Sequence, residues 1–289
     1  MVATTFLVFH ALRTMPDPEA LGLWQAELGR RLGLCGRVVL APQGLHGIVG
    51  GSPQQLGEYA AATKQHQTLA DVRFSWSEGR GSEAHELTVS VRADVSGFGA
   101  TAERQVSGVE LGRDRQLTPH QVHDLVAASG EEVVFVDGRS RRASEVGRFR
   151  GALVPDADES RDVLRDLDNG RFDGLEDRPV VIYSAGGLRS EILGSLMVQR
   201  GFSQVYALDG GIVSYGTAFA DRGLWEGALY VLGERVQIVF GDHTSAIGGC
   251  ETCGARTYSY RACVAPLCTA HALLCNGCAD FALCVAHRN

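Results

Sequence analysis

One turn, between an apolar strand and a helix, constrains this chain more than any other feature. Residues 181–189 read Val-Ile-Tyr-Ser-Ala-Gly-Gly-Leu-Arg. A turn of this kind points backbone N–H groups inward above a helix N-terminus, which makes a small anion cradle. A reactive side chain at its first position lies in a positive field, and such a field lowers the pKa of a catalytic cysteine. The pattern therefore indicates the architecture of a thiol enzyme.

The first position of this turn is nevertheless a serine. We predict Ser184 and Arg189 as the catalytic residues, and we assign the anion cradle to Ala185, Gly186, Gly187, Leu188 and Ser190. A serine hydroxyl stays protonated near neutral pH and cannot carry a persulfide or a sulfenic acid. As a nucleophile it needs an adjacent base, and no histidine lies near the turn in the sequence. The alternative for Arg189 is a solvated or helix-packing arginine.

A second polar pattern follows another apolar strand. Asp137-Gly-Arg139 comes directly after Val133–Val136, and the carboxyl ends of parallel strands line the ligand site of an open α/β sheet. Asp137 and Arg139 are therefore candidates for residues that line the cleft and support it. They could equally pair with each other to hold the loop, and for Asp137 we favour this structural role over a catalytic one.

Seven of the eight cysteines lie after residue 249, in pairs with short spacing. Zinc prefers four nitrogen or sulfur ligands, and a spacing of two to four residues lets one turn present two of them. The spacing predicts two structural zinc ions, with the pairing order open and His271 as an alternative to His287. The eight predicted ligands are Cys250, Cys253, Cys263, Cys268, Cys275, Cys278, Cys284 and His287.

The order of the expected elements indicates an α/β protein with three parts. Residues 1–100 alternate as strand, helix, two strands, helix and one or two strands, which predicts an α+β domain of the ferredoxin-like type. Residues 118–223 alternate strands with helices, which predicts a parallel sheet. Residues 101–117 are expected to be a linker, and residues 224–289 a small zinc-binding segment.

Composition sets broad limits on function. The chain has 289 residues, 45% of them hydrophobic and 21% charged, as in ordinary globular proteins. We see no signal peptide and no apolar run of membrane-spanning length, so we expect a cytoplasmic protein. The net charge of −7 argues against broad, non-specific nucleic-acid binding but not against a local basic patch. Lys64 is the only lysine.

Longer stretches of the sequence resemble a known family. The pattern Asp-x-Arg-x5-Glu-x-Gly-x-Phe-x-Gly-Ala at 137–152 is similar to a rhodanese domain, as are residues 183–191 and 201–215. The last two stretches are close to the version in the oxygen-dependent tRNA uridine hydroxylases (the TrhO family). The segment Gly-Arg-Val-Val-Leu-Ala-Pro-Gln-Gly-Leu-His-Gly at 36–47 and the tail with Cys-Val-Ala-Pro-Leu-Cys at 263–268 also resemble this family.

The resemblance implies a function and a set of partners. It implies modification of uridine 34 in tRNA anticodons to 5-hydroxyuridine, with molecular oxygen as co-substrate and the anticodon region of tRNA as partner. A rhodanese-loop cysteine is required in the family and maps onto Ser184, and the second loop cysteine maps onto Ser190. Candidate tRNA contacts are Arg104, Arg139 and Arg189.

Two other functions remain open at this point. A non-catalytic rhodanese-like module could hold tRNA or a protein partner without a thiol. A sulfurtransferase is the least compatible, because sulfur transfer needs a thiolate where this chain has Ser184. The sequence does not indicate the oligomeric state or the tRNA species.

Overall fold

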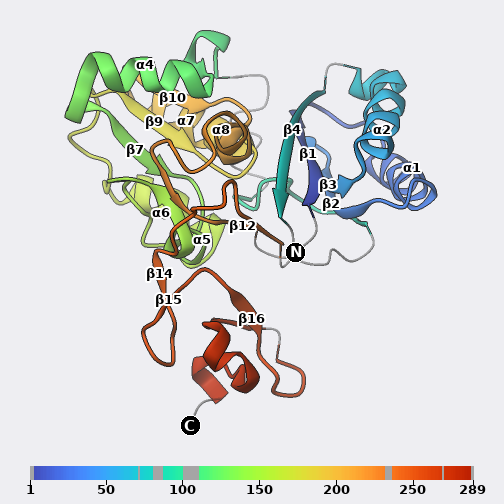
Figure 1. Ribbon diagram of the computed structural model, residues 1–289. Coiled ribbons are helices and arrows are strands. Elements are labelled where there is room, and N and C mark those ends of the chain that lie inside the picture. Colours follow the sequence, from blue (N-terminus) through green and yellow to red (C-terminus); the bar gives the residue numbers. More distant parts are fainter. Residues whose placement is uncertain are drawn as a thin grey trace.

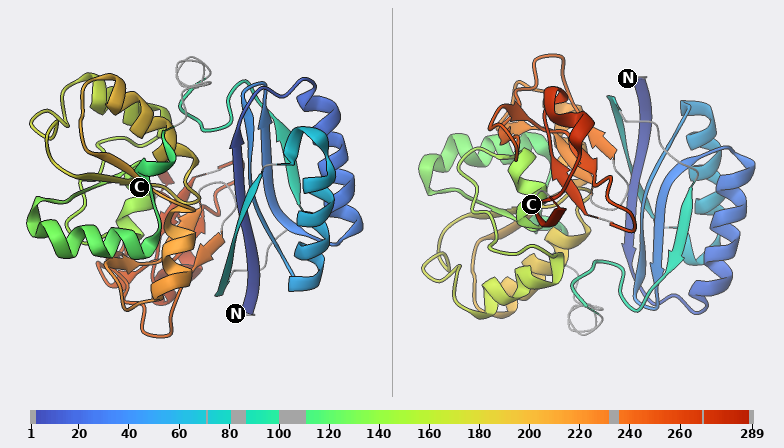
Figure 2. Two further views of the ribbon diagram at one scale, coloured as in Figure 1. Left: turned by 90° about the horizontal axis from the view of Figure 1, so that it is seen from above. Right: turned by 90° about the horizontal axis from the view of Figure 1, so that it is seen from below.

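The computed structural model describes residues 3–70, 72–80, 87–99, 111–231, 236–268 and 270–287. It has an N-terminal α+β domain, a central α/β domain and a cysteine-rich segment that extends from the central domain (Figure 1). The α/β class and these three parts confirm the predicted fold class. The two larger domains lie side by side, and the sheet of the first faces the second (Figure 2).

The N-terminal domain contains one five-stranded sheet with helices on one face. Its strand order is β4-β1-β3-β2-β5, in which only β2 and β5 run parallel. The first four strands and two helices give the expected ferredoxin-like arrangement, with β5 added at the edge. The elements are β1 (Ala3–Leu12), α1 (Pro18–Arg31), β2 (Cys35–Ala41), β3 (Gly44–Gly51), α2 (Pro53–Gln65), η1 (Gln67–Leu69), β4 (Arg73–Arg80) and β5 (Thr88–Val91).

Local sequence explains where the helices of this domain begin. The Asp17 carboxylate accepts from the Ala20 amide at 2.9 Å, and Pro18 occupies the first helical position. Helix α2 begins in the same way, with Ser52 and Gln55 forming a reciprocal capping box. Both helices bury leucine side chains on one face of the sheet. The other face remains available for the central domain.

The central domain contains a four-stranded parallel sheet in the order β6-β10-β9-β7. Strand β9 is central and buried along its whole length, which places the turn after it in the interior. The elements are η2 (Arg113–Arg115), β6 (Gln116–Leu117), α4 (Pro119–Ser129), η3 (Gly130–Glu132), β7 (Val134–Asp137), α5 (Arg141–Val146), β8 (Gly147–Phe149), η4 (Ser160–Asp162), α6 (Val163–Asp168), β9 (Val180–Tyr183), α7 (Leu188–Gln199), β10 (Val205–Leu208) and α8 (Gly211–Phe219).

The end of the expected linker is part of this domain. Gln116 and Leu117 form β6 and pair with β10, so the sheet begins before residue 118. Val95 and Phe98 are buried in the same core as the strands of the central domain. Only a few side chains of these two stretches face the core, and their neighbours are polar. The hydrophobic periodicity of the sequence is therefore weak here. Residues 101–110 of the expected linker lie outside the described residues.

The cysteine-rich segment has short strands and a small core. Its largest buried cluster contains four residues, two of them alanines, which is too little apolar surface to stabilise a domain. Its elements are β11 (Trp225–Gly227), β12 (Leu229–Val231), β13 (Val236–Ile238), β14 (Gly248–Gly249), β15 (Arg256–Thr257), β16 (Tyr260–Ala262), β17 (His271–Leu273), η5 (Asn276–Phe281) and η6 (Val285–His287). Across the described parts of the chain, no helix has the length and apolar character needed to cross a membrane.

The second face of the N-terminal sheet packs directly on the central domain. Phe6 and Val8 of β1 and Ile48 of β3 share one buried cluster with Ala185 and Ile212. The Thr217 hydroxyl of α8 also donates to the Trp76 carbonyl of β4 at 3.2 Å. The turn after β9 is therefore enclosed between two domains, and residues of both can form the site.

Candidate active site

In the turn after β9, the Ser184 hydroxyl oxygen accepts hydrogen bonds from two backbone amides. The amides of Gly187 and Ser190 donate to Ser184 Oγ at 3.2 Å and 3.4 Å. The Ser190 Oγ lies 3.4 Å from Ser184 Oγ and donates to the Gly187 carbonyl at 2.7 Å. Ser184 is 1% exposed. Two donors directed at one buried oxygen at the N-terminus of α7 form a cradle for partial or full negative charge.

Two glycines make this turn possible. Gly187 has φ +99°, a left-handed conformation that strains residues with a Cβ. Gly186 lies against β1 of the N-terminal domain, and a Cβ there would come 2.4 Å from Val8 Cγ1. The same Cβ position lies 3.5 Å from His46 Cε1. The N-terminal domain thus contacts the turn through a position that only glycine fits.

Asp137 and Arg139 form a buried pair held by hydrogen bonds. Arg139 Nε and Nη2 donate to the two carboxylate oxygens of Asp137 at 2.9 Å and 2.6 Å, and both residues are buried. Arg139 Nη2 also donates to the Gly147 carbonyl, and Ser144 Oγ donates to Asp137. These bonds favour a structural role for both residues, although Arg139 Nη1 is buried without a hydrogen-bond partner among the described residues.

A cavity of about 210 Å³ opens between the two domains beside the Ser184 turn. Arg37, Arg92 and Arg189 contribute three positive charges to its wall, against one carboxylate from Asp94. The remaining lining includes Ser184, Gly186, His46 and Tyr230. A polar cavity with an excess of arginine favours an anionic ligand such as a phosphate group.

Burial and neighbouring charges lower the pKa of two basic groups that line this cavity. Burial, together with the nearby Arg139 charge, lowers the pKa of Arg189 to about 10, so its guanidinium remains charged at neutral pH. Burial, with the charges of His10 and Arg189, lowers the pKa of His46 to about 3. His46 is therefore neutral. Its Nδ1 is buried and has no hydrogen-bond partner among the described residues.

Histidines do reach the turn, but from the other domain. His10 and His46 face each other across β1 and β3, and His10 Nε2 lies 3.1 Å from the Glu191 carboxylate on α7. Sequence reasoning also missed Arg37 and Arg92, because their contact with the turn depends on how two domains pack. The available signal was a charged residue, Arg37, at the start of an otherwise apolar strand. Arg104 lies outside the described residues.

A second, larger cavity of about 740 Å³ approaches the turn from the other side of β1. Gly186 lines both cavities, and Glu191 and His10 lie in the wall of the larger one. Lys64 also lines it, with Nζ 5.7 Å from the centre of the Phe74 ring. The turn can therefore be reached from two sides.

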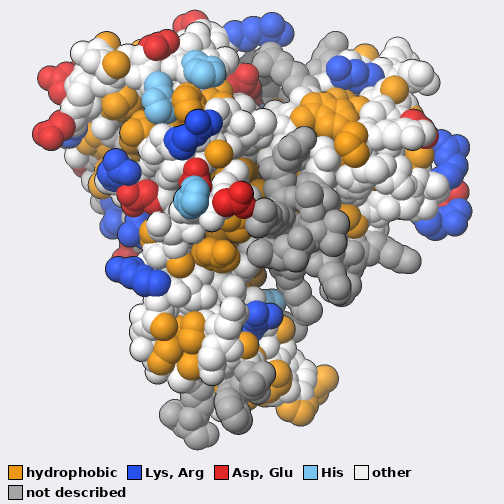
Figure 3. Space-filling model, in the orientation of Figure 1, with side chains coloured by type: hydrophobic (Ala, Val, Ile, Leu, Met, Phe, Trp, Pro, Cys, Tyr) orange, Lys and Arg blue, Asp and Glu red, His pale blue; other side chains and the backbone are white. Residues whose placement is uncertain are grey.

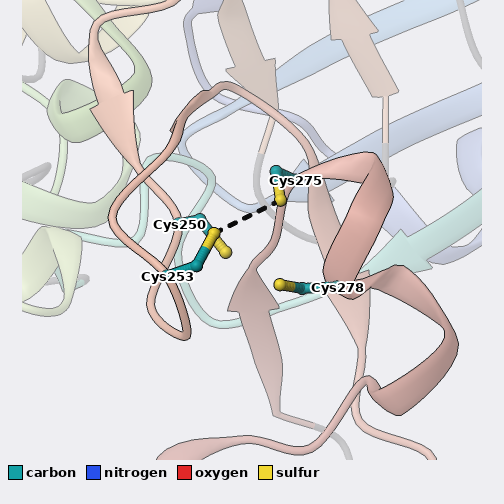
Figure 4. A group of neighbouring side chains, drawn as sticks. All are labelled: Cys250, Cys253, Cys275 and Cys278. Carbon is teal, nitrogen blue, oxygen red and sulfur yellow. Dashed lines mark hydrogen bonds between the residues drawn. The ribbon is translucent and has the colours of Figure 1, made fainter.

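The first cysteine cluster brings together two pairs that are distant in sequence. The donor atoms of Cys250, Cys253, Cys275 and Cys278 lie within 4.8 Å of one another (Figure 4). The sulfurs of Cys253 and Cys275 are 3.6 Å apart. A tetrahedral ion with metal–sulfur bonds of about 2.3 Å separates its sulfur ligands by about 3.8 Å. The four cysteines are free thiols, and their spacing fits a metal ion.

The second cluster comprises Cys263, Cys268, Cys284 and His287. Cys284 Sγ lies 3.2 Å from His287 Nδ1 and 3.8 Å from Cys268 Sγ. The Cys284 amide, which donates to Cys263 Sγ at 3.4 Å, lowers the pKa of that thiol to about 6. The alternative ligand His271 lies on β17 and belongs to neither cluster. The two clusters are interleaved along the chain, a possibility that the spacing had left open.

Comparison with known proteins accounts for most of the chain. Family models match at residues 4–95 (UPF0176 acylphosphatase like domain), 118–218 (Rhodanese-like domain) and 226–287 (Rhodanase C-terminal). A protein of Pseudarthrobacter chlorophenolicus named tRNA uridine(34) hydroxylase is 41% identical over 96% of this chain and 95% of its own length. A protein of Rhodococcus jostii with the same name is 42% identical over 90% of this chain and 92% of its own length.

Proposed function

The chain belongs to the tRNA uridine(34) hydroxylase family, and we propose that it acts on the wobble uridine of tRNA, with molecular oxygen as co-substrate. The observation that carries this proposal is the arginine-lined cavity beside the Ser184 turn. Arg37, Arg92 and Arg189 offer charges that suit the phosphates on either side of a single nucleotide. RNA-modifying enzymes often extract one base from its stack to reach the reacting atom.

The two cysteine clusters are proposed to hold one zinc ion each. The donor sets, four sulfurs in one cluster and three sulfurs with a nitrogen in the other, are those of structural zinc sites. All four ligands of each ion then come from the protein, which leaves no open position for catalysis. The ions supply the stability that the small core of this segment lacks.

A second candidate function is RNA binding without catalysis, and one observation favours it. Hydroxylation of a C–H bond by oxygen transfers one oxygen atom to carbon and reduces the other to water, which requires two electrons from a donor. Ser184 and Ser190 occupy the centre of the site, and hydroxyl groups do not donate electrons as thiols do. The same cradle would favour a thiolate at position 184.

One experiment separates these functions. Unmodified tRNA is incubated with the protein and with Ser184→Cys in air, and its nucleosides are analysed by mass spectrometry. The hydroxylase function predicts 5-hydroxyuridine with the native protein. The binding function predicts a tRNA complex and no product, with thiol reactivity gained only in the Ser184→Cys variant. Failure of the native protein to bind tRNA at all would contradict both.

A further inference from the structure

The loop between Cys263 and Cys268 exposes two apolar side chains to solvent. Leu267 is fully exposed, at 103% of its reference area, and Val264 is 67% exposed. Leu267 also has φ +63°, one of two positive φ values among the described non-glycine residues. A left-handed conformation is unfavourable for a residue with a Cβ, so this loop carries both strain and exposed apolar surface. Strain of this kind persists where surrounding structure imposes it.

The loop is held in this conformation by its surroundings. Strands β16 and β17 pair on either side of it, and the Cys263 amide donates to the Ala270 carbonyl at 2.8 Å. The Val264 amide donates to the Ala282 carbonyl at 2.8 Å, and the Cys268 amide to Ala265 at 3.1 Å. Cys263 and Cys268 both belong to the second metal cluster. The tip is therefore a fixed protrusion, which presents its side chains with little further loss of entropy on binding.

The position of the loop relates it to the interdomain cavity. The hairpin of β16 and β17 projects below the gap between the two larger domains (Figures 1 and 2). Tyr260 of β16 stacks on Tyr230, which lines that cavity, with ring centres 4.5 Å apart. Hydrophobic side chains gather at this edge of the cysteine-rich segment (Figure 3). Residues 252–279 contain no aspartate or glutamate, and Arg261 next to the loop is exposed.

The small apolar area of the tip favours contact with nucleobases over contact with another protein. A stable protein interface buries about 800 Å² on each partner, which two side chains and the neighbouring Pro266 cannot supply. Single apolar side chains such as leucine pack against the faces of nucleobases in nucleic-acid complexes, and RNA loops offer unpaired bases. We propose that Val264 and Leu267 pack against unpaired bases of the RNA loop whose target nucleotide enters the cavity. This inference rests on the proposed function.

The test measures RNA affinity with matched variants. Leu267→Ser, alone and with Val264→Ser, is compared with Leu23→Ser, which changes a leucine that is 75% exposed on α1 of the other domain. Fluorescence anisotropy gives Kd for an anticodon stem-loop and for a blunt RNA duplex. We expect the double variant to weaken stem-loop binding by about fivefold to 30-fold, because two apolar side chains lose part of their buried area. Leu23→Ser should leave the Kd for the stem-loop unchanged. The Kd for the duplex should be the same for all variants.

Leu267→Gly tests whether a loss of RNA affinity is caused by the missing side chain or by a change in the fold of the loop. Glycine accepts the φ of +63° without strain, so this variant should keep its metal content and thermal stability while it loses RNA affinity. Equal stem-loop affinity of the native protein and the double variant would overturn the inference and leave the proposed function intact. A dimer that dissociates on Leu267→Ser, detected by sedimentation, would assign the tip to a second copy instead. Absence of RNA binding by the native protein would overturn both proposals.

Discussion

The Ser184 turn and the cysteine-rich segment are two sites of one chain that keep their shape by different means. The turn lies between a strand buried along its whole length and a mostly buried helix, and a second domain covers it. The cysteine segment has a buried cluster of four residues, and its ligands come from turns and short strands. The turn is positioned by a hydrophobic core, whereas we propose that the cysteine segment depends on metal ions. Four perturbations should therefore affect the two sites differently.

Removal of the metal should have the largest effect, and only on one site. Structural zinc supplies about 10–16 kcal/mol of apparent binding free energy in small domains, and the segment has little core to replace it. We expect a chelator to abolish hydrogen-exchange protection in residues 248–287 and to leave that of β9 and α7 in place. Added zinc should restore the protection. Equal protection of residues 248–287 with and without chelator would show that this segment does not need a metal ion to keep its structure.

Asp137→Asn should destabilise the central domain and leave the metal content unchanged. The change removes one charge of a buried pair and leaves the Arg139 guanidinium without its counterion. We expect a loss of about 3–5 kcal/mol in the free energy of unfolding, measured with urea. Glu27→Gln, which breaks an exposed ion pair on α1, is the control and should leave the free energy of unfolding nearly unchanged, because solvent screens this pair. Similar losses in the two variants would show that Asp137 does not stabilise the central domain.

Gly186→Ala should strain the contact between the two larger domains. The new methyl group would lie 2.4 Å from Val8 Cγ1, so β1 or the turn must shift. Overpacking of this kind costs about 1–3 kcal/mol. Gly57→Ala is the matched control, because a Cβ at that position of α2 meets nothing within 4 Å and alanine favours helix. If calorimetry gives the two variants equal stability, the turn is not tightly enclosed.

His46→Asn should alter the pH dependence of stability by a small amount. The folded-state pKa of about 3 lies below the ordinary value of 6.5, so the unfolded chain binds the proton first as the pH falls. Stability from this group is full above pH 6.5 and declines as the pH falls toward 3, by about 1 kcal/mol between pH 6.5 and 5.5. The variant should lack this decline in urea titrations. If the free energy of unfolding changes equally with pH in both proteins, His46 is not buried as a neutral ring.

Local patterns were informative where the interacting residues are close in sequence, and they failed where distant segments meet. The short spacing of the cysteines indicated eight candidate ligands, which the structure brings together in two groups. Local sequence likewise explains the starts of α2 and α4 at Ser52-Pro53 and Thr118-Pro119. The arginines of the cavity could not be predicted in this way. Of the three candidate tRNA contacts, Arg139 pairs with Asp137, Arg189 lines the cavity, and Arg104 lies outside the described residues.

Arg37, His46 and Arg92 show what sequence reasoning lacks. Each lies on the N-terminal domain, more than ninety positions from Ser184 in the chain, yet all line its cavity. Strand periodicity indicates which face of β2 and β3 a side chain occupies, but not which domain that face meets. The contact depends on the fit between two surfaces. The sequence marks it through glycines such as Gly186 and Gly210, at which a Cβ would meet Val8 or Ser75 of the N-terminal domain.

The interleaved order of the two cysteine clusters has a consequence for synthesis of the chain. Cys250, Cys253, Cys263 and Cys268 supply half of each cluster, and the other halves begin only at Cys275 and Cys284. A ribosome thus releases four thiols before either cluster can close, while the domain that carries Ser184 is already complete. In that interval the nascent chain has exposed, oxidisable cysteines next to a folded central domain. If the clusters take up zinc as proposed, chains made when zinc is scarce should be cleaved by proteases at this segment first, which pulse-chase labelling with and without added zinc would measure.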